Sequence, residues 1–297
     1  MADVSTDLEN LTEAAPVGAP TPVVGDEAGI RKAKPFGFIF WLAVGFLTAL
    51  TLAAIFAEAL PLKDPAQTFA GNNRASPSAE FWFGNDGAGR DIFSRVIFGA
   101  QVSLIVASVG AVLALMVGGM IGMAAGYYRN RVDTMITSFT DATLVIPPLI
   151  LALSLILFLD SDATRRVFIL IVVFVLLSIA PIARVVRAST LVWSEREFVL
   201  AAKTMGARNG RIMFREVLPN VAPALVSYSL IIMANLIVVE GAVAFLGLSV
   251  RPPTPTWGDM INKGRTDLDT AAHVSLVPAA AMFLTVLALN FVGDKLQ

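Results

Sequence analysis

The sequence predicts an all-α polytopic membrane protein with six transmembrane helices. Of its 297 residues, 56% are hydrophobic and 15% are charged, whereas a soluble domain normally carries about 25% charged residues. Six apolar runs each approach the roughly 20 residues that a helix needs to cross a bilayer. We expect the six spans at residues 36–60, 102–127, 140–159, 167–187, 222–246 and 274–292.

The first predicted span follows a long polar tail. Residues 1–30 contain six acidic residues and neither lysine nor arginine, a composition typical of disordered segments. The apolar run at 36–60 is longer than the ~7–15-residue core of a secretory signal peptide, so we expect it to be retained as a helix. The predicted organisation is a disordered cytoplasmic tail at 1–35, the first span, an external loop at 61–100 and a membrane core at 101–297.

The second span carries a small residue at every fourth position. These residues are Gly110, Ala114, Gly118, Gly122 and Gly126. The spacing places them on one ridge of the helix, where small side chains let a neighbouring helix approach closely. We expect this ridge to pack within the subunit rather than against a second subunit.

Prolines interrupt the third and fourth spans. Pro147-Pro148 and Pro181 each remove backbone hydrogen bonds from a helix, so we expect both spans to kink there. We also expect Asp141 to cap the N-terminus of the third span.

Basic residues near the ends of the spans favour cytoplasmic N- and C-termini. In this orientation the inner segments hold 13 lysine and arginine residues and the outer segments hold 9, which agrees with the enrichment of positive charge on the cytoplasmic side. The polar segment at about 195–220 would then face the cytoplasm.

Glu240 is an isolated acidic residue within the apolar run Leu225–Leu248. An unpaired carboxylate is costly inside a membrane, so Glu240 should face a partner, a cavity or a transport path. Two interpretations stay open. Either Glu240 lines a translocation path together with Asn235 and Met233, or it makes a structural hydrogen bond near the outer end of the span.

Several classes of function lack the residues that they need. The chain has no cysteine and one histidine, His273, which excludes disulfides and thiolate metal sites and leaves little for histidine-based catalysis. It contains no phosphate-binding loop of the type GxxxxGK[ST]. Its net charge of −1 gives no basic field that would attract nucleic acid. We therefore predict no catalytic residue, no cofactor, no metal site and no nucleic-acid partner.

The polar segment between the fourth and fifth spans carries Ala201-Ala202, then Gly206, then Leu218-Pro219. These residues indicate two short helices with small residues at an exposed corner, the first closed by the glycine and the second stopped by the proline. The register resembles the "EAA" loop of bacterial ABC-importer permeases. Leu200 replaces the glutamate of that pattern, and Glu216 replaces an isoleucine.

Three further stretches resemble the C-type permease subunit of dipeptide and oligopeptide importers, in the peptide/nickel branch of ABC importers. The stretches are Phe83–Leu104, Asp133 with Asp141–Pro148, and Glu240–Gly258. The chain departs from the family pattern at Asn85, Gln101 and Ala244.

The resemblance implies a type I ABC-importer permease fold with a cytoplasmic coupling loop, in a multi-pass protein of the bacterial inner membrane. It implies as partners a homologous second permease, two ABC ATPase subunits, an extracytoplasmic substrate-binding protein (a lipoprotein or a periplasmic protein) and a peptide substrate. ATP hydrolysis would belong to the ATPase subunits, so we do not expect this chain to be an enzyme.

The resemblance also implies roles for single residues. The ATPase-coupling residues would be Leu200, Ala201, Ala202, Lys203, Gly206, Ala207, Arg208, Arg211 and Pro219, with a smaller contact at Arg129 and Asp133. On the other side of the membrane, Arg90, Asp91 and Arg95 would belong to an external docking surface. We expect these three to form local ion pairs and to extend towards the membrane interface.

Two other transport functions stay open. A nickel-type importer permease shares these motifs, although the chain has no histidine cluster. An ion-coupled secondary carrier would need paired ionisable groups in mid-membrane, and it would not explain the loop that carries Ala201, Gly206 and Pro219.

Overall fold

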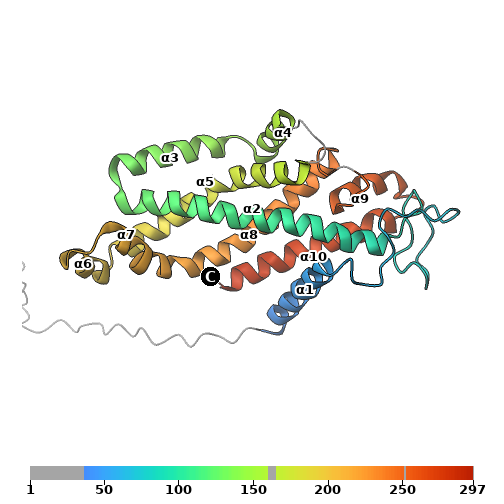
Figure 1. Ribbon diagram of the computed structural model, residues 1–297, viewed down its shortest axis with the longest axis horizontal. Helices are drawn as coiled ribbons and strands as arrows, with labels where there is room; N and C mark the ends of the chain where they lie inside the picture. Colours follow the sequence, from blue (N-terminus) through green and yellow to red (C-terminus); the bar gives the residue numbers. More distant parts are fainter. Residues whose placement is uncertain (1–36, 160–164, 251, 297) are drawn as a thin grey trace, which may run out of the picture. The chain divides into compact units, whose positions relative to one another are not determined.

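The structure is a computed structural model that describes residues 37–159, 165–250 and 252–296, so the tail predicted at 1–35 lies outside the described residues. Helices dominate this part of the chain (Figure 1). They are α1 Phe38–Ile55, α2 Ile92–Tyr128, α3 Asn130–Val145, α4 Pro148–Leu159, α5 Arg166–Ser194, α6 Glu197–Thr204, α7 Asn209–Ile212, a π-helical turn Met213–Val217, α8 Leu218–Phe245, α9 Trp257–Gly264, a 3-10 turn Arg265–Asp267 and α10 His273–Leu296.

Five helical segments in the described residues are long and apolar enough to cross a membrane. They are α1, α2, α5, the segment Asn209–Phe245 that contains α8, and α10. The third predicted span is instead divided into α3 and α4, which meet at a bend of 90° and have the length and hydropathy of a span only together. Ile146, which precedes Pro147-Pro148, has an extended backbone, as the residue before a proline usually does. The kink predicted at these prolines is confirmed.

One local expectation about the spans differs from the structure. Asp141 lies in the C-terminal half of α3, which begins at Asn130, so the prediction that it caps the third span is wrong. Its carboxylate instead accepts a hydrogen bond of 2.5 Å from Arg184 of α5. Pro181 lies inside the continuous helix α5, and the kink expected there stays a prediction.

The most extensive contact between helices joins α2 to α5. A Cβ added to Gly122 would lie 2.3 Å from the backbone oxygen of Ala183, and one added to Gly118 would lie 2.8 Å from that of Ile179. Only glycine allows the two backbones to come this close. The small-residue ridge therefore packs within the subunit, as predicted.

The helix α2 begins at Ile92, well before the start that we predicted at residue 102. Asp91 caps it by accepting hydrogen bonds from the backbone amide of Ser94 at 2.9 Å and from its hydroxyl at 2.6 Å. The boundary predicted for the external loop, 61–100, is therefore wrong at its C-terminal end, because residues 92–100 are helical.

The two ends of α2 carry the two regions that the sequence singles out. Near its C-terminus, Tyr127 contacts Asn209 of α7. Near its N-terminus, Val96 accepts a hydrogen bond from the indole of Trp257, the first residue of α9. The segment with α6 and α7 and the segment with α9 thus lie at opposite ends of this long helix (Figure 1).

Candidate functional site

The helices α6 and α7 form the helix–turn–helix that the sequence predicts, and Gly206 makes the turn. Its φ of +79° is in the left-handed region, which glycine adopts without strain. The amide of Gly206 donates to the carbonyl of Lys203, and the amide of Ala207 donates to that of Ala202, both at 3.0 Å. This pair of bonds is a Schellman motif. An added Cβ at Gly206 would meet nothing within 4 Å, so backbone conformation, not space, favours glycine here.

The outer surface of this turn is both apolar and basic. The exposed fraction is 55% for Leu200, 80% for Met205 and 53% for Phe214. The exposed cations of the same segment are Lys203, Arg208, Arg211 and Arg215. Exposed apolar side chains within a polar rim are typical of protein contact surfaces.

The residues predicted to couple to an ATPase divide by exposure. Those exposed are Leu200, Ala201, Lys203, Gly206, Arg208, Arg211 and Pro219, whereas Ala207 is half-buried and Ala202 is buried. Ala202 and Val199 form the inner face of α6 and belong to the hydrophobic core. Ala202 therefore anchors the segment and does not present a side chain to a partner.

A polar contact ties the segment to the end of α2. The hydroxyl of Tyr127 donates to Oδ1 of Asn209 at 3.1 Å, and the ammonium group of Lys203 lies 5.2 Å from the centre of the Tyr127 ring. Beneath the turn, Ile212 and Val217 are fully buried. The segment is thus held at both of its short helices.

Pro219 does not stop the second helix, and this part of the prediction is wrong. Helical structure continues from Asn209 through a π-helical turn into α8, and Pro219 lies in the first turn of α8. Proline is tolerated in a first turn because its missing amide would have no partner there. Directly before α8, in the turn Met213–Val217, the backbone hydrogen bonds span five residues, as in a π-helix, instead of the four of an α-helix.

The smaller predicted contact lies where α2 meets α3, with Arg129 between the two helices and Asp133 in the first turn of α3. Arg129 donates to Glu195 at 2.7 Å, and the side chains are 42% exposed for Arg129 and 67% for Glu195. Asp133 is paired inside the chain, because its two carboxylate oxygens accept from Nε and Nη2 of Arg187, the latter bond being 2.6 Å long. Asp133 therefore fastens α3 to α5, while Arg129 stays accessible.

Glu240 is almost completely buried, with 1% of its surface exposed. Its Oε2 accepts a hydrogen bond of 3.0 Å from Ser103 of α2, and its Oε1 accepts one of 2.8 Å from Ser249. Of the two interpretations of Glu240, the structure of this chain supports the structural hydrogen bond. Sequence reasoning found the carboxylate but missed both serine donors, because they lie on other segments.

The three residues assigned to a translocation path do not share one face of α8. At 100° per residue, Asn235 and Glu240 point about 140° apart. Asn235 is exposed, Met233 is half-buried and packs against the core, and Glu240 is enclosed. Asn235 is thus separated on α8 from Glu240, and the assignment of these residues to a transport path stays a prediction.

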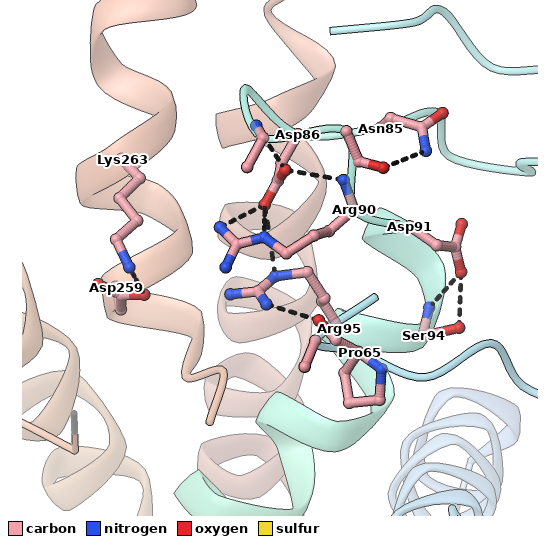
Figure 2. Close-up of polar contacts among 12 residues, drawn as sticks. Pro65, Asn85, Asp86, Arg90, Asp91, Ser94, Arg95, Asp259 and Lys263 are labelled. Carbon is pink, nitrogen blue, oxygen red and sulfur yellow. Dashed lines mark hydrogen bonds and ion pairs between the residues drawn. The ribbon is translucent and has the colours of Figure 1, made fainter. Parts of the chain in front are cut away.

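At the other end of α2, Asp86 gathers a cluster of polar contacts (Figure 2). Its Oδ2 accepts from Nε of Arg90 at 2.8 Å, and its Oδ1 accepts from the backbone amides of Ala88 and Arg90. Arg95 lies beside Arg90, with its Nε 3.6 Å from the same Oδ2. Nη1 of Arg95 donates to the backbone oxygen of Pro65 at 2.8 Å.

The three residues predicted for external docking, Arg90, Asp91 and Arg95, differ in their contacts and in their burial. The expected ion pairs are present for Arg90 and Arg95, both with Asp86. The expectation that all three extend to the membrane interface is wrong, since 4% of Asp91 and 1% of Arg95 are exposed. Asp91 caps α2 and Arg95 braces the preceding segment, so Arg90 is the one of the three whose guanidinium stays partly accessible.

Trp257 and Gly258 fasten α9 to the helices of the core. Trp257 is fully buried, and its Nε1 donates to the backbone oxygen of Val96 at 3.0 Å. A Cβ added to Gly258 would lie 2.5 Å from the backbone oxygen of Gly241. The stretch from Glu240 to Gly258 is thus a structural joint.

Among the described residues, no group of three or more His, Cys, Asp or Glu side chains is placed to hold a metal ion.

Comparison with known proteins gives consistent matches. Residues 118–297 match the family described as "binding-protein-dependent transport system inner membrane component". The glutathione transport system permease protein GsiD of Pectobacterium atrosepticum is 33% identical over 258 residues, covering 86% of this chain and 84% of the relative. The dipeptide transport system permease protein DppC of Alkalihalophilus pseudofirmus is 35% identical over 251 residues, covering 84% and 81%.

A solved structure shares the fold. A chain of the MetNI methionine ABC transporter, in an inward-facing conformation, superposes with a TM-score of 0.57 at 18% sequence identity. The match covers 69% of this chain and 95% of that chain. At this identity the likeness establishes the type I permease fold and nothing further.

Proposed function

The chain belongs to the family of inner membrane components of binding-protein-dependent transport systems, and from this premise we propose that it carries peptides across the membrane within an ATP-driven importer. It forms the path together with a second, homologous permease subunit. The substrate class rests on the relatives, whose names give glutathione, itself a tripeptide, and dipeptides. These names favour peptides over nickel as the transported class.

The observation that carries the proposal is the exposed, anchored turn of α6 and α7. Leu200 and Met205 offer an apolar surface, and Lys203, Arg208 and Arg211 surround it with positive charge. A surface that transmits motion has to be fixed to the helices that move. The bond from Tyr127 to Asn209 and the burial of Ala202 fix this one to α2 and to the core.

The proposed role of the turn of α6 and α7 is to receive the movement of the ATPase subunits. Two ABC ATPase subunits bind and hydrolyse ATP, and their movement reaches this chain through the turn. Arg129, which is half-buried at the neighbouring turn between α2 and α3, makes the smaller contact, and Asp133 holds that turn in place through Arg187. The chain itself performs no catalysis.

The orientation places the turn of α6 and α7 in the cytoplasm, with both termini on the same side. The segment before α2 and the helix α9 then face outward, where a substrate-binding protein delivers peptide. Arg90 contributes to that outer surface, and Asp91 and Arg95 support it from below. This orientation rests on the excess of basic residues in the inner segments.

The transport path is assigned to the exposed side of α8 that carries Asn235. A polar amide on the exposed side of a spanning helix needs hydrogen-bond partners, and a water-filled path or the second permease supplies them. Met233 packs behind this side of the helix, and Glu240 holds the outer end of α8 to α2.

Reconstitution tests the assigned function. The permease pair and its ATPases, purified as a complex and placed in liposomes, should hydrolyse ATP faster when a peptide-loaded binding protein is added. Peptide should accumulate inside the liposomes in the same preparation. Stimulation and uptake with nickel but not with peptide would contradict the substrate class, and uptake that continues without ATP would contradict the importer.

A further inference from the structure

A cavity of about 250 Å³ opens between the segment that precedes α2 and the segment formed by α9 and the 3-10 turn. Six charged residues line it: Arg74, Asp86, Arg90, Arg95, Lys263 and Asp267. An ion pair of 2.9 Å between Arg74 and Asp267 joins the two walls. The cavity is therefore a built feature of the fold and not a gap between independent loops.

The lining carries an excess of positive charge. Four cationic side chains face two carboxylates, Asp86 and Asp267. A third carboxylate, Asp259, accepts a bond of 2.7 Å from Lys263 from outside the lining. After this pairing, the cluster of described residues holds four positive and three negative charges, a net excess of one, and Asp86 is shared between Arg90 and Arg95.

The excess is concentrated where Arg90 and Arg95 lie side by side. Figure 2 shows both guanidinium groups pointing towards the side on which Lys263 and Asp259 lie. Asp86 serves both, but it bonds Arg90 directly at 2.8 Å and lies 3.6 Å from Nε of Arg95. Nε of Arg95 is buried and has no hydrogen-bond partner in the described part of the chain.

We propose that this cavity binds a carboxylate group. A buried guanidinium without a full set of acceptors is costly, and an additional anion would complete it. The planar fork of arginine matches the two oxygens of a carboxylate. The excess of one charge fits a monoanion, whereas a doubly charged phosphate would be repelled by Asp86 and Asp267 at close range.

Two sources can supply the carboxylate, and this part of the inference rests on the proposed importer function. One source is the C-terminal carboxylate of the transported peptide as it leaves the binding protein. The other is an aspartate or glutamate side chain of the binding protein itself. Both present the same group to Arg95, so the site is defined by its chemistry and the experiment separates the sources.

Binding is measured with the whole importer complex in lipid nanodiscs, without binding protein, by calorimetric titration at low ionic strength. N-acetylglycine supplies the carboxylate, and N-acetylglycinamide is its neutral match. We expect saturable binding of the acid and none of the amide. Equal binding of the two compounds, or none of either, would overturn the proposal.

Three variants test the location of the site by the sign of their effect. Lys263→Gln removes a charge from the lining and should weaken binding of N-acetylglycine by about tenfold. Asp259→Asn removes the opposing charge and should strengthen binding. Arg265→Gln is the matched control, since Arg265 is an exposed cation of the adjoining 3-10 turn that does not line the cavity. An equal effect of Lys263→Gln and Arg265→Gln would place the binding elsewhere.

The source of the carboxylate is decided with the variant Lys263→Gln. If the carboxylate belongs to the binding protein, Lys263→Gln should weaken docking of the empty binding protein, and N-acetylglycine should compete with docking. If it belongs to the peptide, docking should be unchanged, and uptake of free-acid peptides should fall while uptake of C-terminally amidated ones does not. An unchanged docking affinity together with unchanged uptake of both peptides would contradict both sources. Basal ATP hydrolysis by the same preparation shows whether the complex itself is intact.

Discussion

Glu240 joins three parts of the chain through one carboxyl group. It lies in α8, and it accepts hydrogen bonds from Ser103 of α2 and from Ser249 in the connection to α9. A buried polar group is tolerated when its hydrogen bonds are complete, and it is costly when a partner is lost. The carboxyl group therefore fixes the outer end of α8.

Replacement of Glu240 should affect stability according to hydrogen-bonding capacity. Glu240→Gln keeps a side chain of the same shape that can bond both serines, and it should unfold close to the wild-type temperature. Glu240→Leu leaves both hydroxyl groups without their acceptor, at about 1–3 kcal/mol for each, and should lower the midpoint of thermal unfolding in detergent. If both variants unfold like the wild type but neither transports peptide, Glu240 acts in the path and not in the structure.

Gly206 permits a second test at the level of a single residue. Gly206→Arg should abolish transport while the protein still inserts into the membrane, because the new side chain projects from the turn that we propose as the contact with the ATPase. Space around Gly206 is open, so the variant should cause no internal clash. Uptake assays and membrane fractionation measure the two effects.

The left-handed backbone at Gly206 calls for its own control. Asparagine adopts this conformation more readily than other non-glycine residues, and its side chain is short. Gly206→Asn should therefore retain most of the transport activity. Normal uptake by Gly206→Arg would refute the coupling role, and equal loss in both variants would assign the effect to backbone strain.

The contact between α2 and α5 is the central packing element of the membrane core. Gly118, Gly122 and Gly126 each bring α2 against backbone oxygens of α5 at distances that leave no room for a side chain, and Gly110 makes a less crowded contact with Phe174. In a membrane, such close backbone approach replaces the hydrophobic driving force that water would provide. A rigid pair of helices also links the turn of α6 and α7 to the opposite end of the molecule.

A single methyl group should disturb this contact. The Cβ of Gly122→Ala would lie 2.3 Å from the backbone oxygen of Ala183, and the strain should cost about 1–3 kcal/mol. Gly119→Ala, three residues earlier on the same helix, meets nothing within 4 Å and should be neutral or stabilise by about 0.5–1 kcal/mol. Thermal unfolding of the two purified variants compares them, and equal midpoints would contradict this description of the interface.

At the scale of the whole molecule, five spans could be predicted because each is a long apolar run. The N-terminal extension of α2 could not, since Asp91 and Arg95 have the appearance of loop residues in the sequence. Their charges are accepted in the fold because Ser94, Asp86 and Pro65 provide partners. Only Ser94 lies within one helical turn of either residue.

One candidate site could be predicted from the sequence and the other could not. The turn at Gly206 was predictable because its small residues and its helix signals are adjacent in the sequence. The cavity near Arg95 was not, because its walls come from residues 74–95 and 260–274. The π-helical turn before Pro219 has no simple sequence signal, and a proline in that position predicts a stop.

We expect the turn of α6 and α7 to be the surface on which an ATPase subunit acts. The chain has no cysteine, so one introduced cysteine gives a unique attachment point for a crosslinker. Ala201→Cys places it on the exposed side of α6, and Ala79→Cys places the matched control on an exposed residue before α2. In native membranes, a short crosslinker from cysteine to lysine is attached at each position, and the adducts are identified by mass spectrometry.

We expect an adduct with an ABC ATPase subunit from position 201 and none from position 79. An ATPase adduct from position 79, or none from position 201 when the complex is otherwise intact, would contradict this expectation.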